Sequence, residues 1–246
     1  MKLHGWSPEA YLSELIGTFF LVFTVSLNAL QRTALAPISI GCIYMVMVSA
    51  TATVSGAHFN PAVTLGALLG SRMLVSPRNA CVYLVVQLLG GLLAGLVCWH
   101  VLGTTYTLHP APGHSTFDVF VVEALFTAAL VFVVRSLWPL QRKGAGQLYL
   151  PLSVGFTVMA AAFAIGGISG YSLNPAVAFG VIMSHWIRTG GGMGYFLVYF
   201  LSPLGGAVLG AGLANALGTA EYRWEVSEQV RLLPPRSRSA QFFTPS

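Results

Sequence analysis

Charged side chains are scarce in this chain of 246 residues. Lys, Arg, Asp and Glu together make up 8% of the sequence, whereas apolar residues make up 55%. Soluble globular domains carry about 25% charged residues, because charged groups cover much of a surface that faces water. This composition excludes an ordinary soluble domain and indicates a protein that lies in a lipid bilayer.

Cysteine is also scarce, and the polar residues form no familiar reactive set. The three cysteines, Cys42, Cys81 and Cys98, all lie in apolar stretches and lack metal-ligand spacing, which excludes a disulfide scaffold and a zinc module. The sequence contains no glycine-rich phosphate loop and no Ser/His/Asp set that could meet in one aqueous cleft. We therefore expect neither an enzyme nor a bound cofactor or metal.

The net charge of +5 does not indicate nucleic-acid binding. Ten of the twelve Lys and Arg residues flank apolar segments or lie in the C-terminal tail, and none belongs to a basic patch interleaved with aromatic residues. Charges in these places are typical of signals that orient a protein in a membrane. The expected surroundings are therefore lipid, with no nucleic-acid partner.

Six apolar runs are long enough to cross the roughly 30 Å of hydrocarbon in a bilayer as helices. They cover residues 10–30, 36–54, 79–102, 117–137, 148–165 and 194–217. Two shorter apolar runs, 61–70 and 175–186, cannot span and are typical of re-entrant segments or buried core helices. The sequence thus predicts an all-α membrane protein with six transmembrane helices and two re-entrant half-helices.

Three motifs occur twice, in the same order. Residues 14–23 match 123–132, residues 55–63 match 169–177, and residues 89–95 match 204–210, at offsets of 109, 114 and 115. The chain therefore consists of two homologous halves, at about 7–102 and 117–217, within a single membrane domain of residues 1–217. Because each half holds three spans, the second half enters from the opposite side, and the 3+3 repeat is inverted.

The basic residues are unevenly distributed between the two sides of the predicted domain. Only Arg32 and Arg188 fall on one side. The other ten fall on the side that carries both chain ends: Lys2, Arg72, Arg78, Arg135, Arg142, Lys143, Arg223, Arg231, Arg236 and Arg238. The positive-inside rule then predicts that both termini, including a tail of residues 218–246, are cytoplasmic. No sorting signal distinguishes the plasma membrane from an organelle membrane.

Each short run begins with the same four residues, Asn-Pro-Ala-Val. The two copies of the first three are Asn60, Pro61, Ala62 and Asn174, Pro175, Ala176. Asn is a favoured helix cap and Pro suits the first helical position, so each copy starts a half-helix inside the membrane. With opposite entry, two positive helix ends of roughly half an elementary charge meet near the midplane and repel cations. Interrupted helices in matching positions indicate a transport path.

These motifs resemble those of the aquaporins, the major intrinsic protein family. The resemblance rests on the doubled Asn-Pro-Ala, on two Glu-x-x-x-Thr segments that begin at Glu14 and Glu123, and on Gln87 with the glycines that follow it. It covers roughly residues 10–217. It implies six tilted helices and two half-helices that enclose a pore in every subunit of a homotetramer.

The resemblance also implies a selectivity filter outward of the two asparagines. By position, its four residues are Ile40, Ala162, Tyr171 and Val177. The family usually has Arg at the place of Val177, and its water-selective members often have an aromatic residue and His at the first two positions. The expected filter therefore lacks fixed positive charge. It still offers an ion nothing that replaces its hydration, so we expect ions to be excluded.

The resemblance implies roles for three further polar residues. Glu14 and Glu123 are expected to accept hydrogen bonds from backbone N–H groups of the two Asn-Pro-Ala loops, whose irregular backbone must be satisfied inside a membrane. His58 lies two residues before Asn60. It has two interpretations: a residue of the cytoplasmic vestibule that gates with pH, or a packed and hydrogen-bonded histidine.

The predicted function is a passive channel for water. A facilitator of glycerol, ammonia or hydrogen peroxide is the alternative, because Ile40 and Ala162 are small. Against the glycerol branch of the family, which commonly has Asp at the following position, this chain has Ala178. A junctional membrane protein with little conduction is a third hypothesis. Relatives often carry a mercury-reactive cysteine at the position of Tyr171, so we expect conduction to resist mercurials.

Overall fold

The computed structural model describes residues 7–69, 73–142 and 148–232, and every regular element in these ranges is a helix. The helices are α1 (Pro8–Gln31), α2 (Ala36–Thr51), α3 (Pro61–Leu68), α4 (Pro77–Leu102), α5 (Thr116–Arg142), α6 (Tyr149–Ser169), α7 (Pro175–Thr189) and α8 (Phe196–Leu232). Several residues used above for topology lie outside the described ranges: Lys2, Arg72, Lys143, Arg236 and Arg238.

The helices begin where local sequence favours a start. Ser7 caps α1 by accepting a hydrogen bond from the Ala10 amide, and Ser76 caps α4 in the same way through Asn79. In both cases Pro occupies the first helical position, where its missing N–H costs nothing. The half-helices α3 and α7 also begin at Pro, directly after Asn60 and Asn174.

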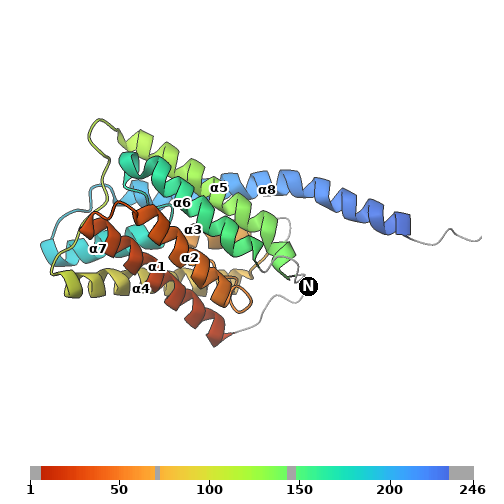
Figure 1. The fold of residues 1–246 in the computed structure, drawn as a ribbon, viewed down its shortest axis with the longest axis horizontal. Coiled ribbons are helices and arrows are strands. Elements are labelled where there is room, and N and C mark those ends of the chain that lie inside the picture. The colour runs from red at the N-terminus through yellow and green to blue at the C-terminus, as the bar shows by residue number, and fades with distance from the viewer. Residues whose placement is uncertain (1–6, 70–72, 143–147, 233–246) are drawn as a thin grey trace, which may run out of the picture.

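Five of the helices are long and apolar enough to cross a membrane: α1, α4, α6 and most of α5 and α8. The sixth, α2, has 16 helical residues and ends three residues before the predicted run does. At 1.5 Å per residue it is about 24 Å long, and it is followed by hydrogen-bonded turns as far as Gly56. The last helix, α8, continues to Leu232, past the predicted domain boundary at 217, and extends beyond the other helices in Figure 1.

The packing follows the internal repeat. Helix α1 packs on α4 as α5 packs on α8, and α2 of the first half meets its counterpart α6 of the second half. Each half-helix contacts the long helix that ends the other half, α3 against α8 and α7 against α4. The two half-helices also meet each other. This exchange of half-helices places both Asn-Pro-Ala motifs in the interior of one bundle, where their residues are buried.

Glycines allow the closest of these helix contacts, and they correct one predicted repeat. A Cβ on Gly90 would lie 2.7 Å from the Leu15 carbonyl oxygen, and one on Gly206 would clash with the carbonyl oxygen of Ala124. Ala124 is the counterpart of Leu15, so Gly206 corresponds to Gly90. The offset here is 116 rather than 115. The glycine next to it, Gly91, instead faces α7, where glycine lets the two backbones approach closely.

Candidate functional site

The two asparagines at the starts of α3 and α7 are joined by reciprocal hydrogen bonds. The Asn60 Nδ2 atom donates to the Leu173 carbonyl oxygen at 2.8 Å, and the Asn174 Nδ2 atom donates to the Phe59 carbonyl oxygen at 2.9 Å. Each side-chain oxygen accepts from the amide two residues later, which is the expected cap. Exposed fractions of 1% and 3% place Asn60 and Asn174 deep inside the bundle.

The loops before both asparagines adopt the same unusual backbone. Ala57 and Phe59 have φ of 52° and 50°, and their counterparts Tyr171 and Leu173 have φ of 61° and 50°. The left-handed region is unfavourable for residues with a Cβ, by about 1–2 kcal/mol each. The strain accompanies a specific arrangement, because the carbonyl groups of Phe59 and Leu173 meet the asparagine of the opposite half.

The Glu14 carboxylate accepts hydrogen bonds from the first loop. Its Oε1 atom accepts from the Ser55 hydroxyl at 2.7 Å and the His58 amide at 2.9 Å, and its Oε2 atom accepts from the Phe59 amide at 2.7 Å. The Gln87 side chain adds a fourth donor at 2.8 Å. A fully buried carboxylate is tolerable only with such partners, and these donors would otherwise lack an acceptor.

The Glu123 carboxylate makes the equivalent contacts in the second half, with one donor fewer. It accepts from the Ser169 hydroxyl at 2.6 Å and from the amides of Ser172 and Leu173 at 3.0 and 2.6 Å. At the register of the glycine contacts, the counterpart of Gln87 is Pro203, which has no side-chain donor. The two loops are therefore held alike through the backbone but differ in their side-chain networks.

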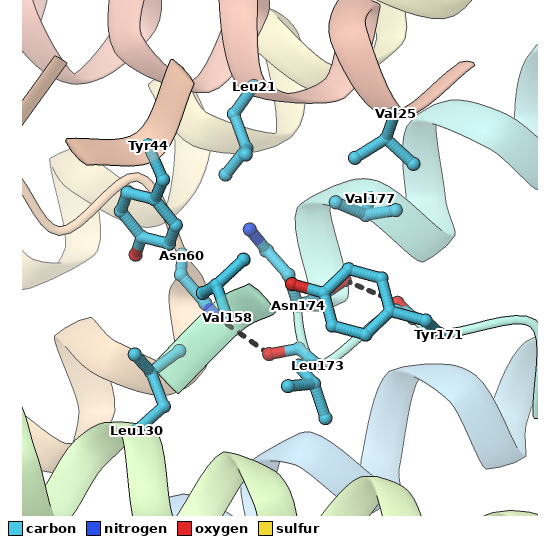
Figure 2. Close-up of a pocket in the computed structure, with 11 residues that line it drawn as sticks. Leu21, Val25, Tyr44, Asn60, Leu130, Val158, Tyr171, Leu173, Asn174 and Val177 are labelled. Carbon is cyan, nitrogen blue, oxygen red and sulfur yellow. Dashed lines mark hydrogen bonds between the residues drawn. The ribbon is translucent and has the colours of Figure 1, made fainter. Parts of the chain in front are cut away.

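A small cavity lies beside the two asparagines, as Figure 2 shows. Its volume of about 10 Å³, measured for the centre of a water-sized sphere, is enough for roughly one water molecule. Most of its wall is apolar. The lining residues are Leu21, Val25, Tyr44, Asn60, Leu130, Val158, Tyr171, Ser172, Leu173, Asn174 and Val177.

The four residues expected in the filter occupy different places. Tyr171 and Val177 line the cavity together with both asparagines, and in Figure 2 the Tyr171 ring extends toward Asn174. Ile40 and Ala162 are buried, on α2 and α6, but they do not line this cavity. Val177 is 1% exposed and belongs to the first turn of α7.

His58 is packed inside the first half. Its ring lies edge-on to Tyr83 and Trp138, with ring centroids 5.4 and 6.4 Å away. Its Nδ1 atom is 3.1 Å from the Thr64 hydroxyl, which in turn bonds Gln87. His58 does not line the cavity. This position fits the interpretation of His58 as a packed, hydrogen-bonded side chain.

Arg135, counted above among the residues that orient the protein in the membrane, lies in different surroundings from those expected. Its guanidinium donates to the carbonyl oxygens of Gly66 and Ala67 at 2.7 and 3.5 Å, and to the Asn215 side chain at 3.2 Å. The last carbonyls of a helix lack partners within it, so Arg135 supplies donors at the end of α3. The signal was present in the sequence, because Arg135 lies inside an apolar run rather than beside it.

Tyr44 is a second residue that sequence reasoning missed. It lies one helical turn after Ile40 on α2 and is 2% exposed. Its hydroxyl donates to the His58 carbonyl oxygen at 2.6 Å, and the residue lines the cavity. Nothing in the local sequence singles it out, because it lies inside a continuous apolar run.

Comparisons of sequence place the chain among known relatives. Residues 5–213 match the family described as "Major intrinsic protein". The chain is 33% identical over 241 residues to Aquaporin TIP2-3 of Arabidopsis thaliana, which covers 92% of this chain and 94% of that protein. It is 32% identical over 228 residues to Aquaporin TIP2-3 of Zea mays, with 87% and 88% covered.

The fold also resembles a solved structure. The aquaglyceroporin from Plasmodium falciparum superposes with a TM-score of 0.74, covering 92% of this chain and 99% of that one, at 21% sequence identity. This likeness supports the helical architecture described above.

Proposed function

This chain belongs to the major intrinsic protein family, and from that premise we propose that it is a passive transmembrane channel for water. One observation carries the proposal. Two opposed half-helices begin at Asn60 and Asn174, and both side chains line a cavity of the size of a water molecule. In this proposal the protein has no catalytic step and needs no cofactor.

The asparagine amides provide the polar contact for water. Each Nδ2 group has two N–H donors, and one of them is used in the reciprocal bond to the opposite loop. No other described residue accepts from either amide. The second N–H is therefore available to a water molecule in the cavity, which otherwise meets an apolar wall.

Ion exclusion follows from the same geometry. The two half-helices direct their N-termini toward each other, and each carries roughly half a positive elementary charge. A cation at this point is repelled. Any ion would also lose its hydration in a mainly apolar passage, at a cost of several kcal/mol. We propose that these two effects replace the arginine that the family usually has at the position of Val177.

A facilitator of small neutral solutes such as glycerol, ammonia or hydrogen peroxide is the second candidate. It is favoured by the small side chains Ile40, Ala162 and Val177 at the positions that resemble the filter of the family. The two candidates differ in whether glycerol passes. The water channel is our primary proposal, and glycerol is the solute that distinguishes it from the second candidate.

The residue roles and the arrangement of the protein in the membrane are part of the proposal. Glu14 and Glu123 hold the Asn-Pro-Ala loops, and their hydrogen bonds to loop amides support this role. Both termini face the cytoplasm, as the ten-to-two distribution of basic residues suggests. The family resemblance supports a homotetramer with a pore in each subunit, and the tail from residue 218 is cytoplasmic.

Permeability measurements on purified protein in liposomes test the proposal. Vesicles that contain the protein should shrink in an impermeant osmolyte well above the rate of empty vesicles. A matched variant, Asn60→Leu, removes one amide from the cavity at similar volume and should lower the rate per reconstituted protein. Shrinkage equal to that of empty vesicles would refute the water channel. Rapid reswelling in glycerol would favour the second candidate.

A further inference from the structure

Two aromatic side chains, Tyr44 and Tyr171, line the cavity beside the asparagine pair. Tyr44 of α2 and Val158 of α6 both line the cavity, and they occupy equivalent positions in the two halves, 114 residues apart. Figure 2 shows Tyr44 and Tyr171 on opposite sides of the cavity, with Val158 and Asn174 between them in that view. The lumen is therefore narrowed by a large ring where its symmetric partner has a small side chain.

The Tyr44 ring is held in place by a hydrogen bond to the loop. Its hydroxyl donates to the carbonyl oxygen of His58 at 2.6 Å, and its ring lies 6.0 Å from that of Phe59, centroid to centroid. Both contacts are to the segment that leads into Asn60. The bond fixes the side-chain torsions of a residue that is 2% exposed, so the ring is a rigid part of the wall.

Tyr44 and Ile40 lie on the same face of α2, at different depths. Residues four apart on a helix share a face, so Tyr44 stands one turn deeper than Ile40 along α2. Ile40 does not line the water-sized cavity, whereas Tyr44 does. Tyr44 therefore adds a second ring beside the asparagines, on the side of the cavity opposite Tyr171.

We propose that Tyr44 sets the width of this channel opposite Tyr171, and that the His58 carbonyl anchors its ring beside Asn60 and Asn174. The constriction thereby coincides with the asparagine pair instead of lying outward of it. Water fits the remaining space, and a solute with a carbon chain does not. This inference rests on the proposed channel function and names the side chain that sets its solute range.

Two substitutions of Tyr44 separate the bulk of the ring from its anchor. Tyr44→Val gives α2 the residue found at the symmetric position and should raise glycerol permeability relative to water by about tenfold or more. Tyr44→Phe keeps the ring but loses the hydrogen bond to the His58 carbonyl. Its ratio of glycerol to water permeability should therefore fall between those of the wild type and Y44V. The matched control is Met45→Val, on the same helix, because Met45 packs on Gly155 of α6. Its ratio should equal that of the wild type.

Osmotic shrinkage and glycerol reswelling are measured in the same proteoliposomes, with rates divided by the amount of protein. Wild-type shrinkage no faster than in empty vesicles would reject the channel function itself. Wild-type water flow with an unchanged glycerol ratio in Y44V would overturn the inference and leave the channel function intact. A wild-type protein that already passes glycerol freely would also overturn the inference about Tyr44.

A third variant keeps the test informative if Y44V is not recovered from membranes. Tyr44→Trp enlarges the same ring and should lower water permeability per protein, whereas Met45→Phe, which adds bulk toward α6, should not. Equal water permeability in Y44W and wild type would contradict a constriction at this residue. A Y44F ratio identical to that of wild type would contradict the anchoring role of His58.

Discussion

At the scale of single residues, each buried carboxylate accepts hydrogen bonds from backbone amides that have no other acceptor among the described residues. Glu14 serves the amides of His58 and Phe59, and Glu123 serves those of Ser172 and Leu173. An amide side chain cannot replace them, because one of its two terminal atoms is a donor. Whichever way it turns, one backbone N–H in the loop loses its partner.

We predict that Glu14→Gln and Glu123→Gln each lower the free energy of unfolding by about 1–3 kcal/mol, the usual cost of a buried unsatisfied donor. Thermal unfolding of the detergent-solubilised protein measures the effect. The control is Glu9→Gln at the exposed start of α1, where the carboxylate bonds only the Ser7 hydroxyl. It should change stability by less than about 0.5 kcal/mol. Equal midpoints for all four proteins would contradict the role of the two carboxylates.

At the scale of elements, the half-helix α3 depends on a residue from another helix for its C-terminal end. Arg135 of α5 donates to the carbonyl oxygens of Gly66 and Ala67, and the same guanidinium reaches Asn215 of α8. A positive charge at this end also complements the helix dipole. Its counterpart one repeat earlier is Ser26 of α1, whose neutral hydroxyl supplies no positive charge. The two half-helices are therefore anchored differently.

Replacing Arg135 with Met should destabilise the protein by about 1.5–3 kcal/mol, the range for a hydrogen bond to a charged group. Arg188→Met is the control, because Arg188 is an exposed residue in the last turn of α7 and bonds only the exposed Thr104 hydroxyl. Unfolding midpoints in detergent compare the two. If both variants unfold at the wild-type temperature, the capping of α3 by Arg135 does not contribute to stability.

At the scale of the whole molecule, the three cysteines lie on α2 and α4, away from the cavity beside the asparagines. Cys42 and Cys81 are exposed, on α2 and α4, and Cys98 is buried in α4. None of them lines the cavity beside the asparagines. We therefore expect a mercurial bound at any of these thiols to leave the cavity open.

We predict that mercuric chloride leaves osmotic shrinkage of the proteoliposomes unchanged. The positive control is Tyr171→Cys, which places a thiol in the wall of the cavity and should make conduction sensitive to the same reagent. Strong block of the wild type at a low concentration would show that a thiol lies in the passage after all. Block of neither protein would exclude residue 171 from the passage.

The sequence by itself determined the class of fold and the two points where the chain enters from opposite sides. Scarce charge required a bilayer, and an inverted repeat follows from three spans in each half. The starts of α3 and α7 were also predictable, because Asn60-Pro61 and Asn174-Pro175 specify a cap and a first turn locally. These features depend on neighbouring residues or on the repeat, so no tertiary contact was needed to find them.

Only the tertiary structure decided which side chains meet at the cavity and which helix supports which. Within lipid an outward face is as apolar as an inward one. Val85 of α4 is 57% exposed and Val22 of α1 is fully buried, yet the sequence does not distinguish them. The inward position of Tyr44, the contact of Arg135 with α3 and the one-residue shift at Gly206 all arise from helices that pack across the repeat. Such contacts join residues far apart in the chain, so the local pattern of hydrophobic residues cannot predict them.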